Sequence, residues 1–204
     1  LMLASYGYLG LLGHERINQA AAEAVHKYGS GTHGVRVLAG TLDLHLELER
    51  TIADFKSAED AVTFSSGYVT NLAAISTIVG RKDIVLCDKY NHASIVDGCL
   101  LSGAELKLFR HNDMDHLESL LKRYSDRNTK LVIVDAVFSM DGDIIDLPGL
   151  VDLCRKYDAW IMMDEAHSVG VLGKTGKGIE EHFGMEDCVD IKMGTLSKTI
   201  PSVG

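Results

Sequence analysis

Three residues with reactive side chains follow two strand-like stretches in the last quarter of the chain. Asp164 and His167 come directly after the apolar run 159–163, and Lys198 comes after the short stretch 189–193. A run of large apolar and β-branched residues predicts a buried strand. Ligands of open α/β sheets bind at the carboxyl ends of the strands, so an acid, an imidazole and an amine are expected to meet there. Such a set can bind a polar ring and form a covalent bond through the amine.

The same stretch has a second interpretation, a nucleotide hydrolase. Asp-Glu-Ala-His after an apolar strand is also the magnesium-binding segment of DEAH-type helicases, and Gly-Lys-Thr at 173–175 resembles the end of a phosphate-binding loop. That loop requires a glycine five positions before Gly173, where the chain has Ser168, and it precedes the acidic segment in those enzymes. A net negative charge also argues against a nucleic-acid partner. We therefore reject this interpretation.

The composition predicts a soluble globular protein. The 204 residues carry a formal net charge of −9, and 46% of them are hydrophobic, which is enough for a core. No apolar run approaches the ~20 residues of a membrane span, and residues 1–4 carry no signal-peptide pattern, so we expect no membrane span and a cytoplasmic location. The four cysteines form no Cys-x-x-Cys pair and are expected to be reduced core thiols, not a disulfide frame or a metal site. They are Cys87, Cys99, Cys154 and Cys188.

Apolar periodicity predicts helices alternating with strands. Helices are expected first at 15–28 and 44–55. We then expect strands at 61–64, 84–87, 105–109, 131–136, 159–163 and 189–193, and helices at 69–79, before 102, at 114–124 and at 148–157. Strands separated by helices of about ten residues predict crossover connections and a mostly parallel sheet covered on both faces. The expected fold class is α/β, a three-layer sandwich without repeats or linkers.

Two glycine-containing loops are candidates for close approach to a ligand or a neighbouring backbone. The first, 29–40, carries His33 and Arg36 between its glycines. His45, at the start of the next helix, is expected to cap or pack there. The second loop ends in Gly67 and Tyr68, which open a helix. The first N–H groups of a helix lack intrahelical partners and lie at its positive end, so this turn is a candidate anion site.

Pyridoxal phosphate is a cofactor that needs each of these groups. Its aldehyde requires a lysine for a Schiff base, its ring nitrogen a carboxylate, and its phosphate N–H and hydroxyl donors. We assign Lys198 to the aldehyde, Asp164 to the ring nitrogen and His167 to the phenolic oxygen. The phosphate is assigned to Gly67, Tyr68, Thr195 and Ser197. Each residue alone is commonplace, and it is their coincidence that favours pyridoxal 5′-phosphate.

Eight motifs occur in an order that is similar to one family. They are Gly-Tyr-Leu-Gly-Leu at 7–11, Gly40-Thr41 with His45 and Leu48-Glu49, Phe-Ser-Ser-Gly-Tyr at 64–68 with Asn71, Asn-His-Ala-Ser at 91–94, His-Asn-Asp at 111–113, Phe-Ser-Met-Asp-Gly-Asp at 138–143, Asp-Glu-Ala-His-Ser at 164–168 with Gly170 and Gly173, and Gly-Thr-Leu-Ser-Lys at 194–198. Together they span nearly the whole chain. The sequence resembles the α-oxoamine synthases, which include 8-amino-7-oxononanoate synthase, 2-amino-3-ketobutyrate CoA ligase, 5-aminolevulinate synthase and serine palmitoyltransferase.

The resemblance implies a fold, a reaction and further site residues. The fold is the large domain of fold-type-I pyridoxal-phosphate transferases, and the reaction joins an amino acid to an acyl-CoA with loss of CO₂, giving an α-aminoketone. His92 matches a histidine that stacks on the cofactor ring, and Ser139 matches a serine near the ring oxygen. Lys198, once released, would remove the substrate α-proton. Family members are homodimers, and the loop around Arg36 is expected at that interface.

Residues around the lysine favour one branch of the family slightly. Ser197 and the segment 200–204 resemble serine palmitoyltransferase more than the oxononanoate or ketobutyrate branches, which usually have glycine before the lysine. Two alternatives stay open. One is another fold-type-I enzyme such as an aminotransferase. The other is a non-catalytic partner subunit, although such subunits typically lack the lysine.

The chain is shorter than the resemblance implies. It ends six residues after Lys198 and does not begin with methionine, so we expect a fragment that is inactive alone. We expect residues 1–45 to form an N-terminal segment that includes the glycine-rich loop and a dimer contact, and residues 46–204 to form an incomplete cofactor-binding large domain. The arginine that binds the substrate carboxylate is expected in a C-terminal domain outside the chain.

Overall fold

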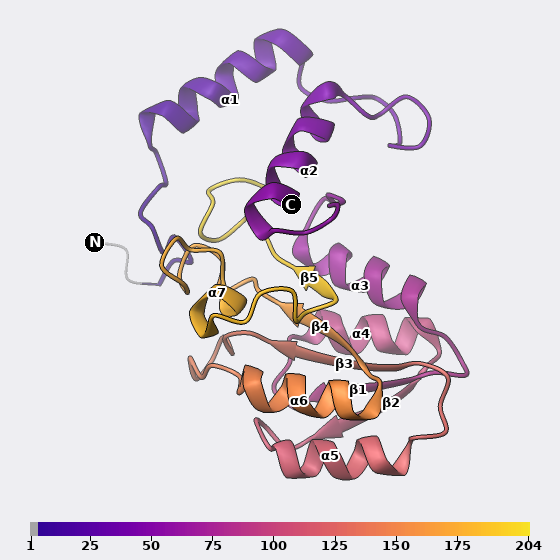
Figure 1. Ribbon diagram of the computed structural model, residues 1–204. Helices are drawn as coiled ribbons and strands as arrows, with labels where there is room; N and C mark the ends of the chain where they lie inside the picture. Colours follow the sequence, from indigo (N-terminus) through magenta and orange to yellow (C-terminus); the bar gives the residue numbers. More distant parts are fainter. Residues whose placement is uncertain (1–3) are drawn as a thin grey trace. The chain divides into compact units, whose positions relative to one another are not determined.

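The computed structural model describes residues 4–204, so the expectation about a signal peptide at 1–4 lies largely outside the described residues. The chain divides into two compact units, one formed by residues 10–63 and the other by residues 64–204 with the segment up to residue 9. Figure 1 shows the helices and strands of both units. In the part of the chain that is described, no helix combines the length and the apolarity needed to cross a bilayer.

The unit 10–63 contains the two helices that the periodicity predicts. Helix α1 spans Glu15–Tyr28. Its C-cap is Gly29, which adopts a φ of 82° that glycine can reach without steric cost. Helix α2 spans Asp43–Lys56. His45 Nδ1 accepts a hydrogen bond of 3.0 Å from the backbone N–H of Leu42, which confirms the expected capping role of this histidine.

The predicted strand at 61–64 is wrong, because its backbone pairs with a side chain instead of a neighbouring strand. The Thr63 N–H donates to Glu49 Oε1 at 2.7 Å, and the Thr63 hydroxyl donates to the same oxygen at 2.9 Å. Arg36 closes the arrangement with two parallel bonds to the Glu49 carboxylate, at 2.7 and 2.8 Å. The Arg36 hydrogen bond, with further donors at Thr63, lowers the pKa of Glu49 to about 2.

We expect Arg36→Ala to destabilise the protein by about 1.5–3 kcal/mol, the usual contribution of hydrogen bonds to a charged group. The Glu49 carboxyl is nearly buried and would keep only its Thr63 donors. Because the pKa of Glu49 is depressed below its ordinary 4.5, the stabilisation is fully present above that value and is lost as the pH falls toward about 2. Urea unfolding at several pH values measures this difference. Arg50→Ala is the control. Arg50 is exposed on α2, next to Glu49, so this change should alter stability little.

The unit 64–204 is built on a parallel sheet with the strand order β2-β1-β3-β4-β5. Its strands are β1 Ile84–Asp88, β2 Glu105–Phe109, β3 Lys130–Asp135, β4 Trp160–Asp164 and β5 Ile191–Met193. The helices are α3 Gly67–Ile78, α4 Ala93–Ser102, α5 Met114–Arg123, α6 Leu147–Tyr157 and α7 Ile179–Phe183. Helices α3 and α4 lie on one face of the sheet and α5 and α6 on the other (Figure 1), so the predicted three-layer α/β fold is confirmed. The short α7 was not expected, because five residues carry too little periodicity to reveal a helix.

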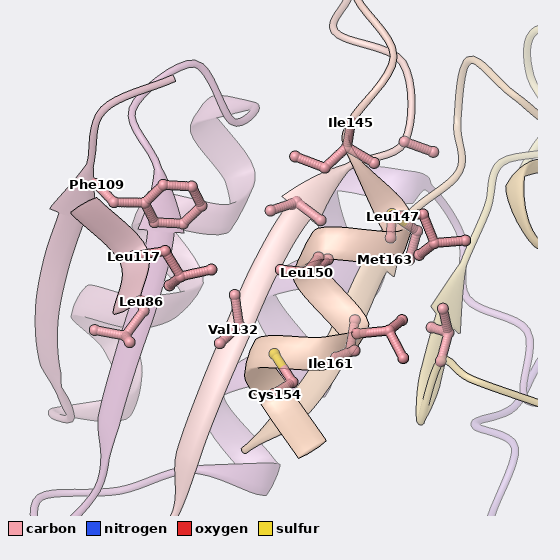
Figure 2. Close-up of a cluster of buried hydrophobic side chains, with 14 of the residues drawn as sticks. Leu86, Phe109, Leu117, Val132, Ile145, Leu147, Leu150, Cys154, Ile161 and Met163 are labelled. Atoms are coloured by element: carbon pink, nitrogen blue, oxygen red, sulfur yellow. The ribbon is translucent and has the colours of Figure 1, made fainter. Parts of the chain in front are cut away.

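The central strands are buried on both faces, which explains their continuous apolar runs. Alternate residues reach opposite layers. Leu86, Val132 and Ile161 pack with Leu117 and Leu150 of α5 and α6, as Figure 2 shows. The other positions, among them Val85, Ile133 and Met162, pack with Ile75 and Ile95 of α3 and α4. Full burial of each such side chain contributes about 1.5–3 kcal/mol.

All four cysteines are free and buried in these layers, as expected of core thiols. Cys87 and Cys99 lie in the α3 and α4 layer with their sulfurs 3.9 Å apart. Cys154 lies in the opposite layer, where burial raises the pKa of its thiol to about 12. A buried thiol of high pKa is a poor nucleophile, so Cys154 serves packing.

Strand register brings the polar strand ends to one edge of the sheet. Asp135 of β3 pairs with Asp164 of β4, and Asp164 pairs with Met193 of β5. Lys198 follows five residues after Met193. The edge that the sequence predicts to carry the site therefore holds two aspartates side by side and a lysine on the adjoining loop.

Candidate active site

Asp164 is held at the end of β4 by donors on both carboxylate oxygens. The Ala166 N–H donates to Oδ1 at 3.0 Å, and Asn71 Nδ2 of α3 donates to Oδ2 at 2.9 Å. Only 5% of Asp164 is exposed. A carboxylate oxygen can accept two hydrogen bonds, so Asp164 keeps room for another donor.

Asp135 is a second buried acid beside Asp164, and sequence reasoning did not single it out. Burial, followed by the negative charge of Asp164, raises the pKa of Asp135 to about 8. Among the described residues, Asp135 Oδ1 and Asn71 Oδ1 are buried without a hydrogen-bond partner. Buried polar atoms are almost always hydrogen-bonded, so two such atoms near Asp164 fit a site that binds a polar ligand.

The amine of Lys198 lies against the imidazole of His167. Lys198 Nζ is 2.9 Å from His167 Nε2, and the other ring nitrogen, Nδ1, is 2.6 Å from the hydroxyl of Tyr8. Tyr6 completes the cluster, with the Lys198 amine 5.5 Å from its ring centroid. Burial lowers the pKa of Lys198 and also that of His167. A lysine with a lowered pKa holds more uncharged amine at neutral pH, the form that attacks a carbonyl.

His92 is tied to Asp164 through two intermediate side chains. Its Nδ1 lies 2.7 Å from Ser94 Oγ, and that oxygen accepts a hydrogen bond of 2.9 Å from Asn71 Nδ2, which also donates to Asp164. His92 is also the N-cap of α4, since its ring accepts from the Ser94 N–H. The Tyr68 ring stands edge-on to the His92 ring, with centroids 6.2 Å apart. The predicted His92 and Asp164 are thus linked through Ser94 and Asn71.

The predicted phosphate residues gather at the N-terminus of α3. Ser66 caps the helix by accepting from the Val69 N–H at 3.2 Å, and the N–H groups of Gly67 and Tyr68 have no partner within the helix. A Cβ on Gly67 would lie 3.4 Å from Thr195 Oγ1. Thr195 Oγ1 lies 2.8 Å from Ser197 Oγ. Two hydroxyls therefore stand beside a positive helix end, an arrangement suited to an anion.

Ser139, the last predicted site residue, lies apart from these contacts. It is exposed in the turn after β3. Among residues 4–204, no hydrogen bond joins Ser139 to Lys198, His167 or Asp164. Its assignment near the ring oxygen stays a prediction.

The glycine-rich segment 173–178 is connected to the residue after Lys198 by hydrogen bonds through residues 169 and 170. Its turn wraps the Glu181 carboxylate, which accepts the N–H groups of Thr175 and Lys177. Gly176 O accepts from the Gly170 N–H at 2.8 Å, and the hydroxyl of Thr199 donates to Val169 O at 2.8 Å. The residue after Lys198 is therefore bonded to Val169, whose neighbour Gly170 is bonded to this segment.

We expect Gly170→Ala to displace Thr199 and with it the Lys198 amine. Gly170 has a φ of +77°, and a Cβ there would lie 2.3 Å from Thr199 Cγ2. Strain at such a φ costs about 1–3 kcal/mol, and activity should fall further because the amine moves. Gly142→Ala is the matched control, since Gly142 has the same φ of +77° with open space around it. Thermal unfolding and turnover of the two variants separate the clash from the φ strain. Equal losses in both would show that the Thr199 contact is unimportant.

Pyridoxal phosphate fits the residues that line this edge. Asp164 keeps an acceptor for a ring N–H, and Lys198 offers a half-buried amine of lowered pKa. The phenolic oxygen and the aldehyde are neighbours on the ring, so His167, which contacts the amine, is placed to reach that oxygen as well. The helix end at Gly67 with the Thr195 and Ser197 hydroxyls suits the phosphate.

Comparison with known proteins finds relatives over the whole chain. The family model described as aminotransferase class I and II matches residues 1–204. An 8-amino-7-oxononanoate synthase of Bacillus velezensis and a serine palmitoyltransferase of Bacteroides ovatus are each 48% identical to the chain, over 100% of it and 52% of their own sequences. The structure of a serine palmitoyltransferase from S. paucimobilis with a bound PLP–myriocin aldimine superposes with a TM-score of 0.95 at 40% identity, covering 98% of this chain and 50% of that one. The chain thus spans about half the length of the curated relatives it matches.

Proposed function

Since the chain belongs to the aminotransferase class I and II family, we propose that its protein is a pyridoxal-phosphate-dependent α-oxoamine synthase. It condenses an amino acid with an acyl-CoA, with loss of CO₂, to give an α-aminoketone. The resemblance that the motifs predict is confirmed by the two relatives, and the expected fold-type-I large domain by the superposition. The observation that carries the proposal is the half-buried Lys198 amine against His167, on the loop after β5, at the sheet edge where Asp164 ends β4.

When bound, pyridoxal phosphate supplies an aldehyde for amine exchange and a ring that accepts electrons from the substrate α-carbon. Asp164 holds a proton on the ring nitrogen, because a carboxylate favours the charged form of its partner. His167 would lie beside the phenolic oxygen, and His92 would cover the ring face. Gly67, Tyr68, Thr195 and Ser197 hold the phosphate.

Lys198 has two tasks in this proposal. Its uncharged amine would hold the cofactor through the aldehyde, and the same amine would be the general base for the substrate α-proton. Burial of the amine favours both tasks, because it raises the uncharged fraction near neutral pH. His167 lies within hydrogen-bond distance and keeps the amine pointed into the site.

We also propose finer assignments that follow the relatives. The substrates are serine and a long-chain acyl-CoA, a choice that Ser197 before the lysine favours slightly. The protein works as a cytoplasmic homodimer. The loop around Arg36 lies at the subunit interface of this proposed dimer.

The test uses protein expressed from the complete reading frame and loaded with pyridoxal phosphate. Serine, glycine and alanine are each supplied with short-chain and long-chain acyl-CoA, and release of free thiol and of CO₂ is measured. Equimolar thiol and CO₂ with one pair of substrates supports the proposal. An aminotransferase would give a keto acid and no thiol, and that outcome would replace the proposed reaction. Sedimentation of the same protein tests the homodimer.

A further inference from the structure

Tyr8 reaches the amine of Lys198 through one intermediate ring. The Tyr8 hydroxyl lies 2.6 Å from His167 Nδ1, and His167 Nε2 lies 2.9 Å from Lys198 Nζ. Both ring nitrogens of His167 are therefore engaged, each with one partner. The contact between Tyr8 and His167 joins residues 159 positions apart, so it depends on the fold and not on local sequence.

The two hydrogen bonds of a neutral imidazole are coupled. One nitrogen carries a proton and donates, and the other has a lone pair and accepts. A phenol at 2.6 Å is a good donor to an imidazole nitrogen. If Tyr8 donates to Nδ1, the ring proton must be on Nε2, and that proton points at Lys198. An N–H donor stabilises an uncharged amine, which has a lone pair, and opposes an ammonium, which has none.

We propose that Tyr8 is a positioning residue that acts through His167: its hydroxyl keeps the ring proton on Nε2, where the imidazole donates to the uncharged amine of Lys198. The inference rests on the proposed function for the importance of this amine. Lys198 is a free amine before it bonds the cofactor aldehyde and again whenever the substrate amine has replaced it. In both situations the chemistry needs the uncharged form.

Other charged groups around the amine act in known directions. Asp164 and Asp135 favour the ammonium form of Lys198, while burial disfavours it and prevails. At His167, burial, Lys198 and, to a smaller extent, His92 favour the neutral ring. Asp164 favours the protonated ring. The Tyr6 ring covers the amine but its hydroxyl has no hydrogen bond among the described residues. Burial also raises the pKa of the Tyr8 phenol, which keeps its proton available for donation.

The test compares Tyr8→Phe with Tyr6→Phe in protein freed of pyridoxal phosphate. Both changes remove a hydroxyl and keep the ring, and only the first breaks a hydrogen bond to His167. Trace acetylation of Lys198 at a series of pH values, quantified by peptide mass spectrometry, gives the titration midpoint of this amine. In Tyr8→Phe the ring is free to place its lone pair toward Lys198, so we expect the midpoint to rise by about one pH unit, which corresponds to the loss of about one hydrogen bond. Acetylation at a fixed pH below the midpoint then slows about tenfold.

Tyr6→Phe should leave the midpoint unchanged. In a His167→Asn background, Tyr8→Phe should cause no further rise, because the intermediate ring is missing. An unchanged or lowered midpoint in Tyr8→Phe would overturn the proposal, and so would a rise that persists without His167. Unfolding curves confirm that each variant is folded. Because the readout needs neither cofactor nor substrate, its failure is separate from a failure of the proposed reaction.

Discussion

Lys198→Ala is expected to abolish the covalent attachment of pyridoxal phosphate and to lower turnover at least about a thousandfold, since nucleophile and general base are lost together. The amine of Lys198 contacts His167 on the loop after β5, at the edge where Asp164 ends β4. Treatment of the loaded protein with borohydride followed by peptide mass spectrometry locates the reduced adduct. We expect it on Lys198 in the unchanged protein and on no residue in the variant.

Lys174→Ala is the control for that experiment. Lys174 is exposed in the glycine-rich turn of the same unit, and its removal should change neither the adduct nor turnover. The variant Lys198→Ala is expected to fold, because its neighbour Thr199 keeps the hydrogen bond to Val169 that fixes this segment. A reducible adduct at the unchanged yield in Lys198→Ala would show that the lysine is wrongly assigned.

The sequence predicts the edge of the sheet better than it predicts the members of the site. Apolar runs reveal the strands, and parallel strands bring their carboxyl ends together, so the meeting of Asp164 with Lys198 follows from general rules. The same signal, an aspartate that ends an apolar strand, occurs three times, at Asp88, Asp135 and Asp164. The strand pattern alone does not tell the three aspartates apart.

The structure separates the three aspartates by their partners. Asp88 is satisfied by the N–H groups of Tyr90 and Asn112 and by His111, so it stabilises the loops after β1 and β2. Within residues 4–204, Asp135 retains a buried oxygen without a hydrogen-bond partner, and it lies beside Asp164. The strand pattern predicts that Asp135 lies at the same edge as Asp164. It does not predict the burial or the hydrogen-bond partners of Asp135.

Long-range contacts account for what was missed. Tyr8 lies in a motif that was recognised, yet its contact with His167 spans most of the chain and leaves no periodic signal. Asn71 connects α3 to β4 and α4 through the two bonds of one amide group. The strand expected at 61–64 fails for a similar reason, because the Glu49 carboxylate, fourteen residues away, takes the Thr63 N–H. Periodicity reports burial, and it does not report which polar group will satisfy a backbone donor.

The second prediction with a large expected effect on turnover concerns the negative charge of Asp164. We expect Asp164→Asn to lower turnover at least about a hundredfold, the usual effect of losing one electrostatic contact to the reacting group. The amide keeps the shape and has one oxygen, which accepts from either Asn71 or Ala166, but it carries no charge to hold a proton on the ring nitrogen. Steady-state kinetics with saturating pyridoxal phosphate measures the loss. A turnover within a few-fold of the unchanged protein would contradict the role of Asp164.

Asp135→Asn is the matched change, and its effect should depend on pH. The pKa of Asp135 is raised to about 8, so at pH 7 this residue is mostly an uncharged acid, which an amide imitates well. We therefore expect a small effect on turnover below pH 8 and a larger one above it.

The pH dependence of stability tests the same assignment independently. The native state binds a proton at Asp135 that the unfolded chain has released between about pH 4 and pH 8, so the free energy of unfolding falls as the pH rises through that window. Asp135→Asn removes this part of the slope, and Asp164→Asn should reduce it, because the charge of Asp164 helps to raise the pKa of Asp135. If urea unfolding of Asp135→Asn keeps the full slope between pH 4 and pH 8, the acid that stays protonated is not Asp135.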